Sequence, residues 1–285
     1  MKYPAPFDPE AFIRAALHED VGDGDHTSNA CIPASALGAA RLLVKQAGII
    51  AGVDLAVRII KQVDKRLKVK VLIKDGAKVL PGDVVFTVHG PERSILMAER
   101  LLLNCMQRMS GIATKTAELV SMIDGTGVKL LDTRKTTPGF RALEKTAVAL
   151  GGGHNHRFGL YDMILVKDNH VDFAGGIAEA LDGVKKLNAK RKKKLKVEIE
   201  ARNIGEVKQI LQHGGADRIL LDNFTPAELK KAVVIIGDRM ETEASGNINA
   251  SNIKAYARGG VNYISVGALT HSYQSLDLSL KAIAK

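Results

Sequence analysis

The sequence predicts an α/β protein: an incomplete parallel α/β barrel, TIM-like with six to seven strands, and a smaller α+β N-terminal domain. Its 285 residues suit two domains, or one barrel with an appendage, at roughly 150 residues per domain. From about residue 112, short apolar runs alternate with helical segments, and the runs end at evenly spaced positions, 199, 221, 244 and 266. That spacing fits a repeated strand, loop and three-turn helix, which predicts parallel strands joined by right-handed crossovers.

The first third of the chain mixes helix and strand signals. Asp8, Pro9 and Glu10 give an N-cap, an N1 proline and an early acid, which predicts a helix over Ala11–Glu19. A long helix is expected to begin near Ser94 and to run past Met109. Between them, apolar or alternating runs bounded by Asp-Gly and Pro-Gly turns predict strands at Arg41–Lys45, Leu67–Ile73 and Val84–Val88.

The remaining chain supplies the barrel. We expect the α+β domain to take in residues 1–111, joined by 271–285, and the barrel to span 112–270. Asn203, Thr225 and Asn249 are candidate N-caps of its helices. The six expected strands are Val128–Leu131, Met163–Val166, Val197–Ile199, Ile219–Leu221, Glu241–Ala244 and Tyr263–Val266.

Composition excludes several classes of protein. With 46% hydrophobic and 25% charged residues, the chain is an ordinary globular protein, neither disordered nor collagenous. No run approaches the ~18 uninterrupted apolar residues of a membrane span. The start, Met1 to Pro4, has no apolar signal region, and the two cysteines, Cys31 and Cys105, lie in unrelated contexts. We therefore expect a cytoplasmic protein without a membrane partner.

The formal net charge of +10 indicates an anionic partner. Eight cations without an acid fall between Lys185 and Lys196, and such a run is most often a solvated helix end or loop. Only 4% of residues are aromatic and no recognition motif is present, so we expect no nucleic-acid partner. Functional positive charge must therefore be sought residue by residue.

Polar residues follow each expected barrel strand almost at once. The carboxyl ends of parallel strands are where ligands bind in barrels and doubly wound sheets. Arginine and lysine side chains at this position can bind carboxylates and phosphates, and exposed backbone amides of a loop can bind phosphate. A pair of acidic side chains can bind hydroxyl groups or Mg²⁺. The pattern predicts a ligand with several negative charges, some of them phosphate, and a divalent metal. The candidates are the cations Arg134, Lys135, His156, Arg157, Lys167 and the more distant Arg100, the acids Glu200 and Asp222, and the loops at Ser245–Asn247 and Gly267.

Two glycine-containing segments are ambiguous. Gly151–Arg157 is either a flexible turn with surface histidines or part of the site, and its spacing does not decide between them. The segment His18–Thr27 suggests a calcium loop, but twelve-residue loops from Asp20 or Asp23 lack the acidic last position. A loop capped by Asp and Gly is the better interpretation.

In a series of short motifs the chain resembles a known family, quinolinate phosphoribosyltransferase, the decarboxylating nicotinate-nucleotide pyrophosphorylase. The motifs occur in the family's order along nearly the whole chain, and no motif residue is missing. It rests on GDHTS (24–28), AER (98–100), SGIAT (110–114), LDTRKTTPGFR (131–141), NHR (155–157), GLYD (159–162), VKDNH (166–170), VEIE (197–200), LDNF (221–224) and EASGN (243–247).

The resemblance implies an activity in de novo NAD biosynthesis. Members join quinolinate to 5-phosphoribosyl-1-pyrophosphate (PRPP), giving nicotinate mononucleotide, pyrophosphate and CO₂ with Mg²⁺ as cofactor. It implies that Arg134, His156, Arg157 and Lys167 hold the quinolinate carboxylates. Lys135 would lie beside the PRPP phosphates, with Thr136 in the same substrate-binding motif. Glu200 and Asp222 would bind the ribose hydroxyls and Mg²⁺, and with Lys135 they are the expected catalytic residues. Ser245, Gly246, Asn247 and Gly267 would cradle the 5′-phosphate.

The resemblance also implies a homodimer, because Arg100 matches a family residue that reaches the neighbouring subunit's site. Two other functions stay open. A paralogue of the same fold could use another acid, and a Schiff-base lyase on a similar barrel could use Lys167 as its amine.

Overall fold

The computed structural model describes residues 6–283, and its internal contacts divide them into two compact units. The first unit holds the described residues up to 117, residues 137–152, and those from 272 onward. The second holds residues 118–136 and 153–271. Residues 137–152 thus lie with the first unit, although the sequence places them with the barrel.

The first unit is built on an antiparallel sheet in the order β12-β1-β5-β3. Leu42 of β1 pairs with Leu280 of β12 on one side and with Phe86 of β5 on the other, and Leu42 and Phe86 are fully buried. The C-terminal strand β12 is therefore an edge strand of the sheet formed by the N-terminal strands. The strands of this sheet are β1 (Leu37–Val44), β3 (Lys68–Val71), β5 (Val84–Pro91) and β12 (Leu278–Ile283). Two short strands, β2 (Gly48–Ile49) and β4 (Lys78–Val79), form a separate antiparallel pair.

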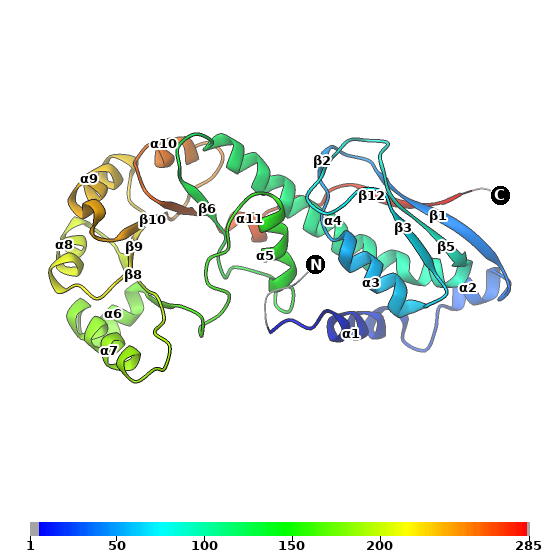
Figure 1. Cartoon of the computed structure of the whole chain (residues 1–285), viewed down its shortest axis with the longest axis horizontal. Coiled ribbons are helices and arrows are strands. Elements are labelled where there is room, and N and C mark those ends of the chain that lie inside the picture. Colours follow the sequence, from blue (N-terminus) through cyan, green and yellow to red (C-terminus); the bar gives the residue numbers. More distant parts are fainter. Residues whose placement is uncertain (1–5, 284–285) are drawn as a thin grey trace. The chain divides into compact units, whose positions relative to one another are not determined.

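The two helices that the sequence predicts in this part of the chain are present, and each begins two residues before its expected start, at Pro9 and Glu92. The Asp8 carboxylate accepts hydrogen bonds from the N–H groups of Glu10 and Ala11 at the start of α1 (Pro9–Val21). Asp25 caps α2 (His26–Cys31) in the same way, so the Asp- and Gly-rich segment before it is a helix cap. The others are α3 (Val53–Val63), the 31-residue α4 (Glu92–Met122) and α5 (Arg141–Leu150), and Figure 1 shows α3 and α4 lying along the sheet.

The second unit is an incomplete parallel barrel. Its six strands run in the order β6-β11-β10-β9-β8-β7, so the first strand pairs with the last. His154 adds a parallel bridge to Leu131 on the other side of β6, and within residues 6–283 the sheet stays open between that bridge and β7. The predicted six to seven strands are confirmed. They are β6 (Lys129–Leu131), β7 (Ile164–Val166), β8 (Val197–Ala201), β9 (Arg218–Asp222), β10 (Glu241–Ser245) and β11 (Tyr263–Ser265).

Helices surround this sheet on its outer side (Figure 1). Asn203 and Thr225 cap α8 and α9 as predicted. The prediction for Asn249 is wrong: the N-cap residue of α10 is Asn252, and the Asn249 side chain accepts from the Ser251 N–H at 2.9 Å in the preceding turn. The helices are α6 (Asp168–Ala174), α7 (Ile177–Ala189), α8 (Ile204–His213), α9 (Pro226–Ile236), α10 (Ile253–Ala257) and α11 (Ala268–His271), with a 3₁₀ turn at Gly237–Arg239.

The basic run occupies the last turns of α7 and the loop leading to β8, and all eight of its cations are exposed. Lys196 forms an ion pair with Glu241 at 3.8 Å. Within residues 6–283, no helix is both long and apolar enough to cross a membrane.

Candidate active site

A cavity of about 880 Å³ opens at the carboxyl ends of the barrel strands, and all of its lining belongs to the second unit. This volume lies within the roughly 300–1,000 Å³ of ordinary ligand sites. The location is the one expected for a parallel barrel. It brings together most of the predicted residues: Arg134, Lys135, His156, Arg157, Lys167, Glu200, Asp222, Ser245, Gly246, Asn247 and Gly267.

Two predicted residues do not line the cavity. Thr136 turns back on its own loop, where its N–H donates to the Arg134 carbonyl at 2.9 Å. Arg100 is an exposed residue of α4 in the first unit. Their assignments stay predictions.

Two guanidinium groups form the cationic side of the cavity. Arg157 is 9% exposed, and its side chain donates to the Met163 carbonyl at 3.3 Å. Burial, and then the positive charge of Arg134, lower the pKa of Arg157. The Nε atom of Arg134 is buried without a hydrogen-bond partner. Two partly desolvated cations that repel each other favour an anionic ligand, and guanidinium geometry suits carboxylates.

Two carboxylates face the cavity from neighbouring strands, Glu200 on β8 and Asp222 on β9. Burial, and then the Asp222 carboxylate, raise the pKa of Glu200 to about 7, while Lys167 opposes the shift. The Lys167 Nζ lies 3.9 Å from a Glu200 oxygen. Two acids that repel each other beside open space are suitable ligands for a cation or for sugar hydroxyls.

The loop after β10 turns sharply through left-handed backbone conformations. Gly246 has φ +97°, Asn247 has φ +53°, and Asn223 after β9 has φ +56°. A Cβ atom on Gly246 would lie 2.2 Å from the Asn223 Oδ1, so only glycine fits there. Asn247 donates from its side chain to that same oxygen at 3.2 Å. Such turns expose backbone N–H groups to a concave site and suit phosphate.

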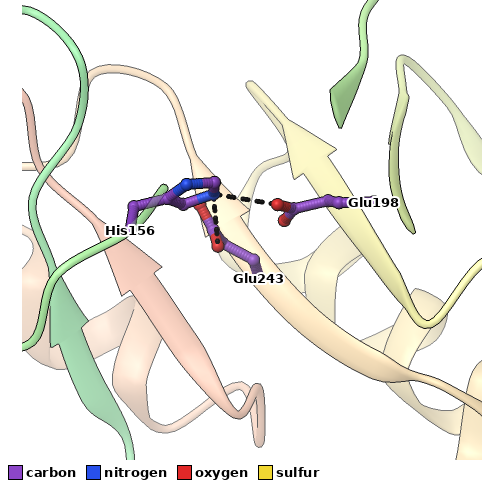
Figure 2. Close-up of side chains that lie close together, drawn as sticks. All are labelled: His156, Glu198 and Glu243. Carbon is purple, nitrogen blue, oxygen red and sulfur yellow. Dashed lines mark hydrogen bonds and ion pairs between the residues drawn. The ribbon is translucent and has the colours of Figure 1, made fainter. Parts of the chain in front are cut away.

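A buried charged cluster adjoins the cavity, which His156 and Glu243 line, and Figure 2 shows its three central side chains pointing toward one another. The Nε2 atom of His156 lies 2.8 Å from Glu198 Oε2 and 3.6 Å from Glu243 Oε2. Both glutamates are fully buried, and burial raises the pKa of each, that of Glu243 to about 7. The guanidinium of Arg218 approaches Glu243 Oε2 at 3.0 Å.

Sequence reasoning missed several lining residues, among them His271 and Glu243. His271 lines the cavity beside Gly267, where a Cβ atom would lie 3.1 Å from the His271 Nε2, but the sequence ended the barrel at 270. Glu243 also lines the cavity. The sequence did contain a signal for Glu243, because it lies with Glu241 at alternate positions of an expected buried strand. A buried charge needs a partner to offset the cost of its desolvation.

Comparisons with known proteins agree with this architecture. Residues 112–281 match the model of the quinolinate phosphoribosyl transferase C-terminal domain, and residues 25–110 match that of the N-terminal domain. A chloroplastic nicotinate-nucleotide pyrophosphorylase [carboxylating] of Oryza sativa subsp. japonica is 45% identical, covering 96% of this chain and 78% of that protein. A probable nicotinate-nucleotide pyrophosphorylase [carboxylating] of Bacillus subtilis is 40% identical, covering 92% and 89%.

The solved structure of the nicotinate-nucleotide pyrophosphorylase from Francisella tularensis superposes with a TM-score of 0.90 at 41% identity, covering 96% of each chain. Matched domain models over most of the chain, relatives above 30% identity and a common fold agree with one another. This chain therefore belongs to the quinolinate phosphoribosyltransferase family.

Proposed function

We propose that this protein transfers the phosphoribosyl group of PRPP to quinolinate with loss of CO₂, giving nicotinate mononucleotide and pyrophosphate. The observation that carries the proposal is a single cavity lined by Arg134 and Arg157, by the carboxylates of Glu200 and Asp222, and by the left-handed Gly246 loop. Each part suits a different anionic or hydroxyl group of the two substrates. The names of the relatives support the same reaction.

Arg134, His156, Arg157 and Lys167 would hold the two carboxylates of quinolinate, His156 through the backbone of Arg157, whose N–H donates to its ring. Lys135 would meet the PRPP phosphates, and the 245–247 loop with Gly267 would hold the 5′-phosphate. In support, the Lys135 side chain lies close to Gly267, where a Cβ atom would be 3.0 Å from its Cδ. Lys135 would therefore lie next to Gly267, one of the residues proposed to hold the 5′-phosphate.

Glu200 and Asp222 fit Mg²⁺, because burial and the Asp222 carboxylate raise the pKa of Glu200, and a divalent ion would relieve the repulsion between the two carboxylates. When bound, Mg²⁺ would neutralise charge on the pyrophosphate group. The same two residues are suited to the ribose hydroxyls, and they are the acids nearest to where positive charge would develop on the ribose.

The expected mechanism depends on electrostatics and positioning. The bond between C1′ and pyrophosphate breaks with oxocarbenium character, which nearby carboxylates stabilise, as they do in glycoside chemistry. The pyridine nitrogen then bonds to C1′. The resulting pyridinium charge stabilises the electron pair left on C2 when CO₂ departs, and a proton then replaces the carboxylate. No covalent nucleophile is required, so preorganised charges provide most of the catalysis.

Exposure of Lys167 disfavours the Schiff-base alternative, since its side chain is 51% exposed and amines that form Schiff bases are typically desolvated. Borohydride trapping with substrate would reveal a Schiff base. The paralogue alternative is tested by the assay itself, in which CO₂ must be released from quinolinate only when both PRPP and Mg²⁺ are present.

Arg157→Ala tests the quinolinate contacts. Removing a buried partner of a carboxylate costs roughly 2–5 kcal/mol, so quinolinate binding should weaken at least tenfold. Arg202→Ala is the matched control, because Arg202 also follows a barrel strand but pairs with Glu206 and Asp172 and does not line the cavity. Unchanged quinolinate binding by Arg157→Ala would show that the assignment is wrong.

We also propose a homodimer in which Arg100 completes the neighbouring site, and a cytoplasmic location. The exposure of Arg100 on α4 supports the homodimer, because an exposed side chain can reach a neighbouring subunit. The free, exposed thiol of Cys31 supports the cytoplasmic location, because thiols stay reduced there. Mixing Arg100→Ala with Arg157→Ala should restore activity in hybrid dimers. Absence of restored activity, with subunit exchange demonstrated, would contradict the shared site.

A further inference from the structure

The backbone and the ring of His156 are both held by acids from the barrel strands. Its N–H donates to Asp132 Oδ1 at 2.9 Å, just after β6. Its ring Nε2 faces Glu198 of β8 at 2.8 Å, with Glu243 of β10 further away at 3.6 Å. Figure 2 shows the imidazole turned toward these two glutamates.

The other ring nitrogen is also engaged. The backbone N–H of Arg157 donates to His156 Nδ1 at 2.6 Å, so Nδ1 is the acceptor and the ring proton lies on Nε2. The Nε2–H therefore donates to Glu198. With both nitrogens engaged, the ring fixes the backbone of the next residue, Arg157, whose guanidinium lines the cavity.

The strand geometry separates two layers of side chains inside the barrel. Side chains two residues apart on a strand share a face, so Glu198 lies one layer below Glu200, and Glu243 one layer below Ser245. Glu200 and Ser245, in the upper layer, line the cavity. Glu198 and Glu243, in the lower layer, lie beside the His156 ring, and Glu243 lines the cavity as well.

The spacing of His156, Glu198 and Glu243 would also suit a metal ion. The position of Arg218 argues against that use. Its guanidinium lies 3.0 Å from Glu243 Oε2 and 4.0 Å from Glu198 Oε1, so a fixed cation already balances the pair. A second cation would meet its repulsion in a buried site.

We propose that Glu198 and Glu243 are positioning residues for quinolinate binding, which act through the His156 ring on Arg157. This inference rests on the proposed function. Strand-borne side chains hold a site more precisely than loop residues do, and the segment 155–157 is itself a loop. The glutamates, which are anchored on strands of the sheet, thus restrain the position of that loop.

The test uses Glu198→Met and Glu198→Gln. Methionine fills the space but cannot accept the Nε2–H, whereas glutamine can. We expect Glu198→Met to raise KM for quinolinate at least tenfold while KM for PRPP changes less than twofold, and Glu198→Gln to stay within threefold of wild type for both. In a His156→Ala background, Glu198→Met should add less than twofold. Equal changes in both KM values, or a full additional effect in the double variant, would overturn the proposal.

A second measurement needs no folded variant of Glu198. Nitrogen NMR of ¹⁵N-histidine wild-type enzyme, with His156→Asn identifying the signal, should show His156 protonated at Nε2 and not at Nδ1. The Nδ1–H form or the imidazolium would overturn the inference. Arg157→Ala in the same kinetic assay separates the two hypotheses: if it leaves KM for quinolinate unchanged, the proposed function's contacts fail. If it raises KM while Glu198→Met does not, only the positioning role fails.

Discussion

Replacing Gly246 by alanine tests the proposed phosphate loop most directly. The new Cβ would lie 2.2 Å from Asn223 Oδ1, 2.7 Å from its Cγ and 2.9 Å from its backbone N, whereas ordinary contact begins at 3.4 Å. The loop or Asn223 must therefore move by about 1 Å. The left-handed backbone adds a cost of roughly 1–2 kcal/mol for a residue with a Cβ.

A displacement of this size is large for a catalytic site, where a 1 Å misplacement can cost on the order of 10²-fold. We expect kcat/KM for PRPP to fall by roughly 10- to 100-fold on the same argument. The fall in quinolinate affinity, measured by direct titration without PRPP, should be small, because the loop holds only the phosphate end. Initial rates of CO₂ release at varied PRPP give the first quantity.

Gly214→Ala is the matched control. Gly214 also has positive φ, +74°, but no atom lies within 4 Å of its new Cβ, so that variant carries the strain without the clash. It should lose a little thermal stability and keep its kinetic constants. If Gly246→Ala matches Gly214→Ala in kcat/KM for PRPP to within twofold, the loop does not hold the phosphate.

Three further outcomes are expected. Arg66 and Ser94 hold the pKa of Asp64 well below its ordinary value of 3.8, so its contribution to stability is present above about pH 4 and is lost as pH falls below that. The difference in melting temperature between wild type and Asp64→Asn should therefore be full at pH 7 and shrink toward pH 3; a constant difference would contradict this. Removing divalent ions with a chelator should abolish CO₂ release, and Mg²⁺ should restore it, whereas full activity in chelator would refute the Mg²⁺ proposal. Thr225→Ala removes one side of the capping box of α9 and should lower the free energy of unfolding by about 1 kcal/mol in denaturant titration, with KM values unchanged.

The sequence predicted the barrel strands closely because their signal is local. The expected strand Ile219–Leu221 lies inside β9 (Arg218–Asp222), and the caps at Asn203 and Thr225 were found because a cap depends on residues three positions apart. Asn249 failed as a cap for a related reason. Several Asn and Ser side chains adjoin it, and only the folded turn selects Asn252 as the N-cap.

What the sequence by itself determined was the set of polar residues at the strand ends, since periodicity marks where each strand stops. Only the tertiary structure decided how they are used. It brought Glu200 beside Asp222, gave Gly246 its contact with Asn223, and turned the ring of His156 away from solvent toward Glu198. These residues are far apart in the chain, and their distances depend on how neighbouring strands pair in register. Hydrophobic periodicity reports which face is buried, but it carries no information about which buried charge meets which.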